Sequence, residues 1–238
     1  FLKLVMHCYK NVPYYQEKFA EYGIRPKSIQ SVDDIKKIPI LNKEIIRKNL
    51  NKLKATNMDN NKKKYTFSTS GSTGEKLQFF GTDEVFKKEA AFILRYFIQT
   101  GAEMYDKPSI WLRRYVPEDS NSRLWYFDDE LKRLYISAYH INQETIFEYF
   151  KIIHSIKAST LVTYPSSAYI LAKLAKKNNL NFKYINQIRV ASEKMQNSWA
   201  KEINNVFKIK PLAHYGQIEK VSFMHQTHES TDYKYIHE

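Results

Sequence analysis

A short stretch rich in hydroxyl groups and glycine is the part of this sequence best suited to chemistry. Its glycines let the backbone curl so that successive amides converge, and its serines and threonines add hydrogen-bond donors. A lysine adds positive charge where the stretch ends. The residues are Thr69, Ser70, Gly71, Ser72, Thr73, Gly74 and Lys76. Amides, hydroxyls and one cation in this order suit a loop that binds oxyanions such as phosphates, although a loop of this composition, taken alone, more often has no ligand.

This loop does not match the Walker A motif of P-loop nucleotide hydrolases. That motif needs adjacent glycine and lysine, followed by serine or threonine. Here Glu75 separates Gly74 from Lys76, and Leu77 follows the lysine. The sequence therefore argues against an ordinary P-loop NTPase.

A second motif lies far downstream, where Tyr-Gly-Gln-Ile-Glu occupies residues 215–219. It follows a candidate strand, and α/β sheets bind ligands at the carboxyl ends of their strands. The carboxylate of Glu219 could hold Mg²⁺ against the phosphates of a nucleotide. Taken alone, a glutamate in this position is more often a surface residue.

Together, the two motifs resemble the adenylate-forming superfamily of acyl-CoA ligases, which carries a TSGSTG-type loop and a downstream YGxTE element. The loop matches that pattern without a gap. Within the superfamily, the chain is similar to the phenylacetate-CoA ligase branch and its capsular-polysaccharide relatives, the CapK-like proteins. The stretches that point to this branch are 11–15, 38–43, 164–167 and 191–193.

The resemblance implies a role for each matching residue. The loop from Thr69 to Lys76 would cradle the β- and γ-phosphates of ATP, and Glu219 would coordinate Mg²⁺, so catalysis is assigned to Lys76 and Glu219. The residues implied to bind the adenine or the adjoining acyl group are Ala191, Ser192, Glu193, Tyr215, Gly216 and Gln217. The residues implied to contact the acid substrate, with a possible gate to the acyl pocket among them, are Tyr139, His140 and Tyr164.

The implied reaction agrees with these residue types. A small-molecule carboxylic acid attacks the α-phosphorus of ATP and expels pyrophosphate, so the enzyme supplies positioning and charge neutralisation. The acyl group then passes to CoA, a carrier protein or another nucleophile, and the resemblance to the CapK-like proteins implies a role in polysaccharide biosynthesis. ATP and Mg²⁺ are the expected cofactors, and a cytoplasmic protein is expected. The sequence leaves open the acid, the acyl acceptor and the oligomeric state.

Two departures from the family pattern bear on activity. Ile218 stands where the family has a threonine, which removes a hydroxyl near the substrate phosphate. The family's ribose-binding aspartate and its lid with a catalytic lysine would lie beyond Glu238. Because the chain starts at Phe1 and stops without a terminating signal, we expect a fragment that is slow or inactive by itself. A degenerate member that keeps nucleotide binding or a scaffolding role is the alternative.

Composition limits the other classes of function. The formal net charge of +13 allows a basic nucleic-acid-binding protein, yet 30 of the 38 basic residues are lysines spread along the chain. Base-edge recognition favours arginine, so we expect no nucleic-acid partner. No apolar run approaches the length that spans a bilayer. The single cysteine, Cys8, excludes a disulfide framework and fits a reducing compartment.

The elements that must position these residues follow from the apolar pattern. Short β-branched or aromatic runs alternate with longer helical ones after residue 64, which favours parallel strands joined by crossover helices. The candidate strands are 64–68, 109–112, 160–163, 188–191 and 210–214, and the candidate helices are 83–99, 142–156, 166–178 and 196–207. The expected fold is α/β, with layered sheets and crossover helices as in the large N-terminal domain of adenylate-forming enzymes, without the C-terminal lid.

Three parts are expected along the chain. Residues 1–50 form a helical segment, in which Ser31 and Asp34 suit a capping box and Asn42 can cap the next helix. Residues 51–64 lack apolar periodicity and form a polar linker, and residues 65–238 form a truncated AMP-binding core.

Other groups of residues favour structural roles. His225, His228 and His237 invite a zinc site, but zinc needs a more complete ligand set. Arg113 and Arg114 follow a candidate strand and could meet an acidic substrate or the phosphates, but a solvated pair is the commoner explanation. The aromatic run 125–127 could stack on bases, but packing in a core or acyl pocket is the commoner explanation.

Overall fold

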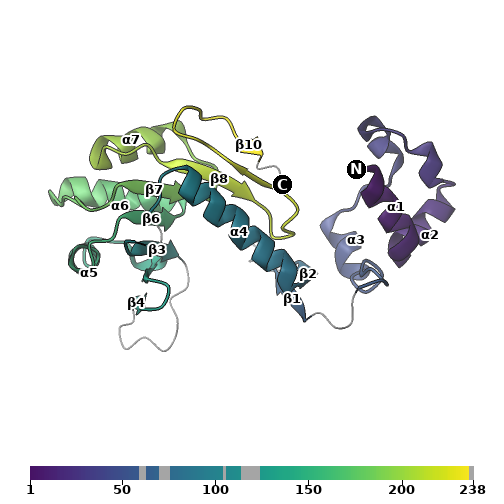
Figure 1. The fold of residues 1–238 in the computed structure, drawn as a ribbon, viewed down its shortest axis with the longest axis horizontal. Coiled ribbons are helices and arrows are strands. Elements are labelled where there is room, and N and C mark those ends of the chain that lie inside the picture. The colour runs from purple at the N-terminus through teal and green to yellow at the C-terminus, as the bar shows by residue number, and fades with distance from the viewer. Residues whose placement is uncertain (59–62, 70–75, 104–105, 114–123, 236–238) are drawn as a thin grey trace. The chain divides into compact units, whose positions relative to one another are not determined.

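The computed structural model describes all residues except 59–62, 70–75, 104–105, 114–123 and 236–238 (Figure 1). It divides into two compact units, Phe1–Lys87 and Lys88–Glu238, and the division falls within helix α4 (Asp83–Gln99). The predicted division into helical segment, linker and core stays a prediction. No helix in the described ranges is long and apolar enough to cross a membrane.

The first unit begins with short helices around a small apolar cluster of Val5, Phe19 and Ile29. Its elements are α1 (Leu2–Asn11), α2 (Pro13–Glu21), the 3-10 helices η1 (Pro26–Ser28) and η2 (Val32–Lys37), and α3 (Lys43–Lys48). The capping box of Ser31 and Asp34 is present at η2. The side chain of Asn42 accepts a hydrogen bond from the Ile45 amide at 2.8 Å. Both caps predicted from the sequence are therefore confirmed.

The first unit also contains a β-hairpin, in which residues 64–68 form a strand that is not part of a parallel sheet. Strand β1 (Lys64–Ser68) pairs antiparallel with β2 (Gln78–Thr82), with Ser68 opposite Gln78. The expectation that residues 64–68 join parallel neighbours is wrong, because the connection over residues 69–77 is too short for a parallel crossover. Gly81 is required in the hairpin, since a Cβ there would lie 2.7 Å from the Phe67 ring.

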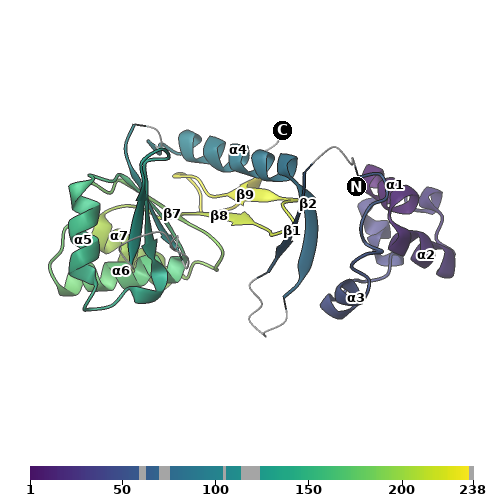
Figure 2. The ribbon, with the colours of Figure 1, turned by 90° about the horizontal axis from the view of Figure 1, so that it is seen from below.

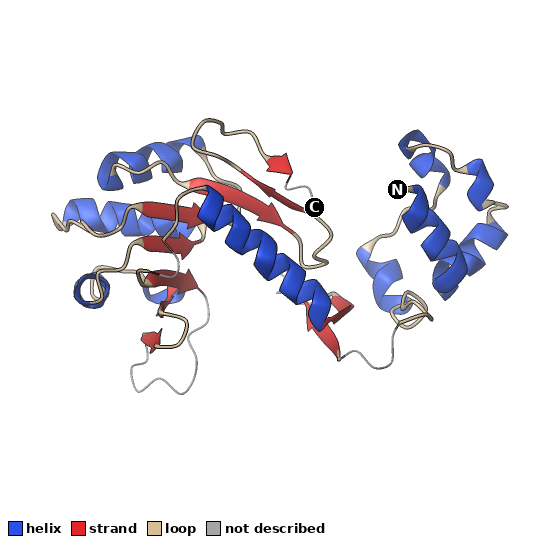
Figure 3. Ribbon diagram, in the orientation of Figure 1, coloured by secondary structure: helices blue, strands red, loops and turns tan. Residues whose placement is uncertain are grey.

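The second unit is built on an eight-stranded sheet with the order β10-β9-β8-β7-β6-β3-β5-β4. Its strands are β3 (Ser109–Arg113), β4 (Trp125–Asp128), β5 (Arg133–Ser137), β6 (Thr160–Thr163), β7 (Gln187–Val190), β8 (Leu212–Gly216), β9 (Phe223–His225) and β10 (Lys234–Tyr235). The five central strands from β8 to β5 are parallel, and β4, β9 and β10 are antiparallel additions at the two edges. This arrangement confirms the predicted α/β class with a mainly parallel sheet (Figure 3).

Helices cover both faces of this sheet. They are α5 (Ile146–Ser155), α6 (Pro165–Lys177) and α7 (Asn197–Phe207) on one face, with α4 on the other (Figure 2). Strand β6 shows the division, because Leu161 packs in the cluster with α5, α6 and α7 while Val162 packs with Tyr96 and Phe97 of α4. Neighbouring residues of a strand point to opposite faces. The sheet is therefore a buried middle layer, as its nearly continuous apolar strands require.

A buried arginine fixes the carboxyl end of α4 to this sheet. Arg189 of β7 has no solvent exposure, and its guanidinium donates to the Thr100 carbonyl at 2.6 Å and to the Thr100 hydroxyl at 2.8 Å. Burial lowers the pKa of Arg189. His228 also contacts the Thr100 carbonyl, at 3.0 Å through Nε2, which must be the donor since a carbonyl only accepts. Two donors thus meet the negative end of the helix dipole.

The side chains buried on the central strands should contribute strongly to the free energy of unfolding. Ile188 is fully buried between β6 and β8, so Ile188→Ala should lower the free energy of unfolding by about 2–5 kcal/mol, while Ile188→Val should lower it by about 0.5–1.5 kcal/mol. Urea denaturation of the two variants checks this. Ile170→Ala is the control, because that α6 side chain is 41% exposed and should change stability by under about 0.5 kcal/mol. Equal losses at both positions would contradict the assignment of the core.

Candidate functional site

The carboxyl edge of the parallel strands collects the predicted site residues of the second unit. Because β8, β7, β6, β3 and β5 run in the same direction, the segments that follow them emerge at one edge of the sheet. In sheet order from β8 to β5, the predicted residues at this edge are Tyr215 to Gln217, Ala191 to Glu193, Tyr164, and Tyr139 with His140. Segments that follow adjacent strands, such as residues 191–193 after β7 and Tyr215 at the end of β8, are therefore neighbours along this edge.

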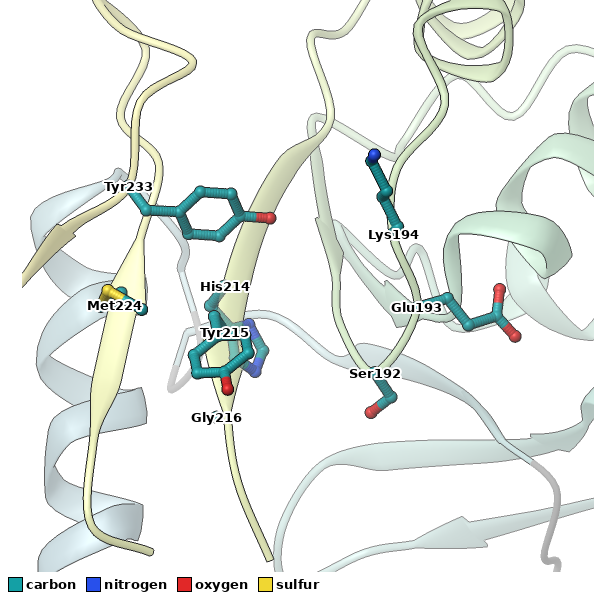
Figure 4. A pocket seen from close by; sticks show the side chains of 8 residues that line it. All are labelled: Ser192, Glu193, Lys194, His214, Tyr215, Gly216, Met224 and Tyr233. Carbon is teal, nitrogen blue, oxygen red and sulfur yellow. The ribbon is translucent and has the colours of Figure 1, made fainter. Parts of the chain in front are cut away.

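A cavity of about 440 Å³ opens at the β8 and β7 end of this edge (Figure 4). It is lined by Ser192, Glu193, Lys194, His214, Tyr215, Gly216, Met224 and Tyr233. The predicted residues Ser192, Glu193, Tyr215 and Gly216 are thus brought together. Ala191 and Gln217 adjoin them in sequence but do not line the cavity, and neither do Tyr139, His140 and Tyr164. His214, Met224 and Tyr233 complete the walls and were not predicted.

The turn after β7 forms one wall and is tied to a helix. Ser192 has a positive φ of 72°, in the left-handed region that a non-glycine residue adopts at a cost. The neighbouring Glu193 accepts a hydrogen bond from the Ser166 amide at 3.1 Å, in the first turn of α6. Figure 4 shows the Glu193 carboxylate directed away from Tyr215 and Tyr233. Glu193 therefore contributes its backbone and side-chain stem to the cavity, while its charge caps α6.

The opposite wall carries a histidine that stays neutral. The His214 ring stacks on Phe223 at 5.3 Å and lies 5.6 Å from the Tyr96 ring. Burial lowers its pKa to about 4, and the positive charges of Arg113 and Arg189 act in the same direction. Its Nδ1 has no hydrogen-bond partner among the described residues. At neutral pH this wall therefore presents an uncharged ring.

Tyr215 projects from β8 and is held by the next side chain along. The Gln217 amide donates to the Tyr215 hydroxyl at 3.0 Å, and Tyr215 is 43% exposed. An aromatic face supported in this way suits stacking on a planar ring. Gln217 therefore does not line the cavity but supports Tyr215, which does.

The remaining residues of the edge lie beside β5, β3 and β6. His140 Nδ1 contacts the Ser137 hydroxyl at 2.7 Å, and Tyr139 is 69% exposed. The Arg113 guanidinium lies 4.5 Å from the centre of the Trp111 ring, and this packing desolvates it and lowers its pKa, although much of the residue is exposed. The predicted acyl gate of Tyr139 and His140 stays a prediction.

Glu219 occupies an exposed turn directly after β8. Its carboxylate makes no hydrogen bond or ion pair with any residue that the structure describes. Mg²⁺ commonly takes one or two carboxylates and obtains its other ligands from phosphates and water. Within the described ranges, no group of three or more His, Cys, Asp or Glu residues could hold a metal by itself. If Glu219 holds Mg²⁺, the other ligands of the ion would have to come from phosphates and water, and its role as a metal ligand stays a prediction.

The ends of the hydroxyl-rich loop are closed in the first unit. The Thr69 amide donates to the Leu77 carbonyl at 2.9 Å, and the Leu77 amide donates to the Thr69 hydroxyl at 3.1 Å. Lys76 is exposed beside this closure. The predicted residues Ser70, Gly71, Ser72, Thr73 and Gly74 lie outside the described residues.

Comparisons with known proteins agree with these observations. No family model matches the sequence. Protein CapK of Staphylococcus aureus is 27% identical over 177 residues, which make up 74% of this chain and 38% of CapK. An open structure of a 2-hydroxyisobutyryl-CoA ligase in complex with 2-HIB-AMP and CoA superposes with a TM-score of 0.67 at 16% identity, covering 97% of this chain and 55% of that one.

The same ligase in its postadenylation state gives a TM-score of 0.64 at 14% identity, with 97% of this chain and 50% of that one covered. At these identities the likeness to the ligase shows the fold. The chain spans 38% of CapK and about half of the ligase.

Because His214 is neutral in the folded chain, we expect the free energy of unfolding to fall as the pH is lowered. The unfolded imidazole titrates near 6.5 and the folded one at a pKa of about 4, so the unfolded chain binds the proton first and stability falls as pH falls through this range. Between pH 7 and pH 5 this group should remove about 2 kcal/mol. His214→Gln should flatten that part of the profile in urea denaturation. Parallel profiles for the variant and the wild type would contradict the assignment.

The contribution of the Glu193 cap on α6 to the free energy of unfolding should be measurable as well. Glu193→Ala removes both the charge and the hydrogen-bond acceptor from Ser166, and should lower the free energy of unfolding by about 1–2 kcal/mol. Glu193→Gln keeps an acceptor and should cost less. Glu130→Ala, at an exposed position, serves as the matched control in thermal denaturation. A Glu193→Ala loss no larger than that of the control would show that the cap contributes nothing.

Proposed function

Because this chain is a CapK-like member of the adenylate-forming superfamily, we propose that it forms the nucleotide-binding part of a ligase that activates a carboxylic acid with ATP. The observation that carries the proposal is the cavity at the carboxyl edge of the sheet, where the turn after β7 meets Tyr215 and Gly216 of β8. Glu219 follows directly on the same strand connection.

The chemistry assigned to each residue follows from its surroundings. Tyr215, Gly216 and Ser192 would enclose a flat ring, since the cavity between them is walled by an aromatic face and backbone. Glu219 would hold the Mg²⁺ of Mg-ATP, and that ion neutralises phosphate charge when bound. The loop from Thr69 to Lys76 would bind the outer phosphates with amides, hydroxyls and one cation.

With the nucleotide held in this way, a substrate carboxylate oxygen attacks the α-phosphorus. The bond from that phosphorus to the bridging oxygen breaks, and pyrophosphate leaves with the electron pair. The product is an acyl-adenylate, and CoA or another nucleophile then bonds to its acyl carbon while the bond to the phosphate oxygen breaks and AMP leaves. The 2-HIB-AMP and CoA in the ligase structure support these ligand classes. A role in polysaccharide assembly is suggested by the similarity to CapK.

A second function is favoured by Ile218, which is half-buried in the turn before Glu219. A threonine there would supply a hydroxyl next to the metal-binding carboxylate, and isoleucine cannot. A member of the superfamily that binds nucleotide without activating an acid would tolerate this change. Pyrophosphate exchange measured beside ATP binding separates the two functions, since only the ligase supports exchange.

The binding site itself is tested by calorimetry of Mg-ATP with the 238-residue chain. Lys76→Met, Glu219→Gln and Tyr215→Ala should each weaken binding by roughly tenfold, because they remove a charge, a metal ligand and a stacking face. The controls are Lys151→Met and Glu229→Gln, exposed residues outside the proposed site. Unchanged affinity in all three site variants would show that the nucleotide site is misassigned.

A further inference from the structure

The turn that carries Glu219 is anchored by the residue next to it. The Lys220 ammonium lies 2.6 Å from a carboxylate oxygen of Glu89 in α4, and the two side chains are only 15% and 24% exposed. By contrast, the helical pair of Lys48 and Glu44 is 71% and 70% exposed. Solvent screens a shielded pair less than an exposed one, so the pair of Lys220 and Glu89 holds its geometry better.

We infer that Lys220 and Glu89 are positioning residues that fix the direction of the Glu219 carboxylate toward the metal ion of Mg-ATP. This inference rests on the proposed function. It means that the ion pair not only stabilises the local fold but also supports metal binding.

The backbone of the turn supports this inference. The Lys220 amide donates to the Gln217 carbonyl at 3.1 Å, which closes a four-residue turn with Ile218 and Glu219 at its corner positions. Lys220 has a positive φ of 59°, a conformation that glycine adopts without cost and lysine does not. Strain of this kind persists only where the surroundings hold it in place. The ion pair to α4 supplies that hold.

The second observation concerns Glu219 itself. Its side chain contacts no partner among the described residues, so the backbone of the turn sets the position from which its carboxylate reaches a ligand. The turn is attached on one side through Gln217 to the Tyr215 hydroxyl and on the other through Lys220 to Glu89. Ligands of metal ions are commonly oriented by such neighbours, whose loss costs about 10- to 100-fold in metal affinity.

The test separates metal binding from nucleotide binding. ATP affinity of the 238-residue chain is measured by calorimetry with Mg²⁺ and again with EDTA. Glu89→Gln and Lys220→Met should each reduce the Mg²⁺-dependent gain in ATP affinity by about tenfold or more and leave the affinity without Mg²⁺ unchanged. The reversed pair, Glu89→Lys with Lys220→Glu, should restore most of the gain. Glu44→Gln on α3 is the matched control for loss of an exposed ion pair.

A second measurement needs no nucleotide. Hydrogen exchange of the amides in residues 217–222 should be faster in Glu89→Gln and Lys220→Met than in the wild type, and the reversed pair should return it toward the wild-type rate. Thermal unfolding midpoints close to the wild type show that the fold is intact. A general loss of folding would instead lower ATP affinity both with and without Mg²⁺, and would count against a positioning role.

The outcomes distinguish this inference from the proposed function. If Glu219→Gln removes the Mg²⁺-dependent gain while Glu89→Gln and Lys220→Met keep it, the positioning role is wrong and the proposed function stands. Unchanged exchange in the turn would also overturn the positioning role. If the wild type shows no Mg²⁺-dependent gain, the proposed function fails, and the assignment of Lys220 and Glu89 to metal binding fails with it.

Discussion

The parallel pairing of five central strands is the constraint on which the site depends. Parallel ladders place every carboxyl end at one edge, and the register sets which turns become neighbours: Val190 pairs with Thr163 on one side and with Ala213 on the other. A slip of one residue would exchange the two faces of a strand and put Leu161 where Val162 packs against α4. The two clusters of buried side chains on opposite faces therefore fix the position of the turn after β7 against the end of β8.

The face beneath α4 is chemically unlike the other face, and this difference shapes the cavity. Helices α5, α6 and α7 cover an almost purely apolar surface, whereas α4 covers a layer that includes Arg189, His214 and His225. Burial is the main reason why His214 stays neutral, and the positive charges of Arg113 and of the buried Arg189 guanidinium act in the same direction. The same guanidinium holds the end of α4 through Thr100. One buried arginine thus contributes to helix anchoring and to the electrostatics of the cavity wall.

The sequence predicted the elements with strong local signals and missed those set by pairing. The helix at 83–99 and the strand at 160–163 agree with the structure to the residue, because both have clear apolar patterns and punctuation. Strands β9 and β10 have three and two residues, too short for any periodicity, so Met224 of β9 and Tyr233, which precedes β10, were missed. β2, β4 and β5 were missed as well, because hairpin and edge pairing is a tertiary choice. The structure brings Ser192, Glu193, Tyr215 and Gly216 of the predicted motifs together around one cavity, but nothing in the motifs indicates that the Glu193 carboxylate turns toward α6.

The turn after β7, which borders the cavity, and the turn after β8, which carries Glu219, are both strained and are both attached to a helix. Each contains a non-glycine residue with positive φ, Ser192 after β7 and Lys220 after β8. Each is attached to a helix by a charged side chain at or beside the strained residue: Glu193 binds the first turn of α6, and Lys220 binds Glu89 of α4. Because α6 and α4 lie on opposite faces of the sheet, the edge is held from both sides. Glycine at either position would relieve the backbone strain, yet the strained residue is kept where the turn needs a fixed backbone direction. The conformational cost of the strain is offset by the bonds to α6 and α4, the two helices whose packing defines the layers of the fold.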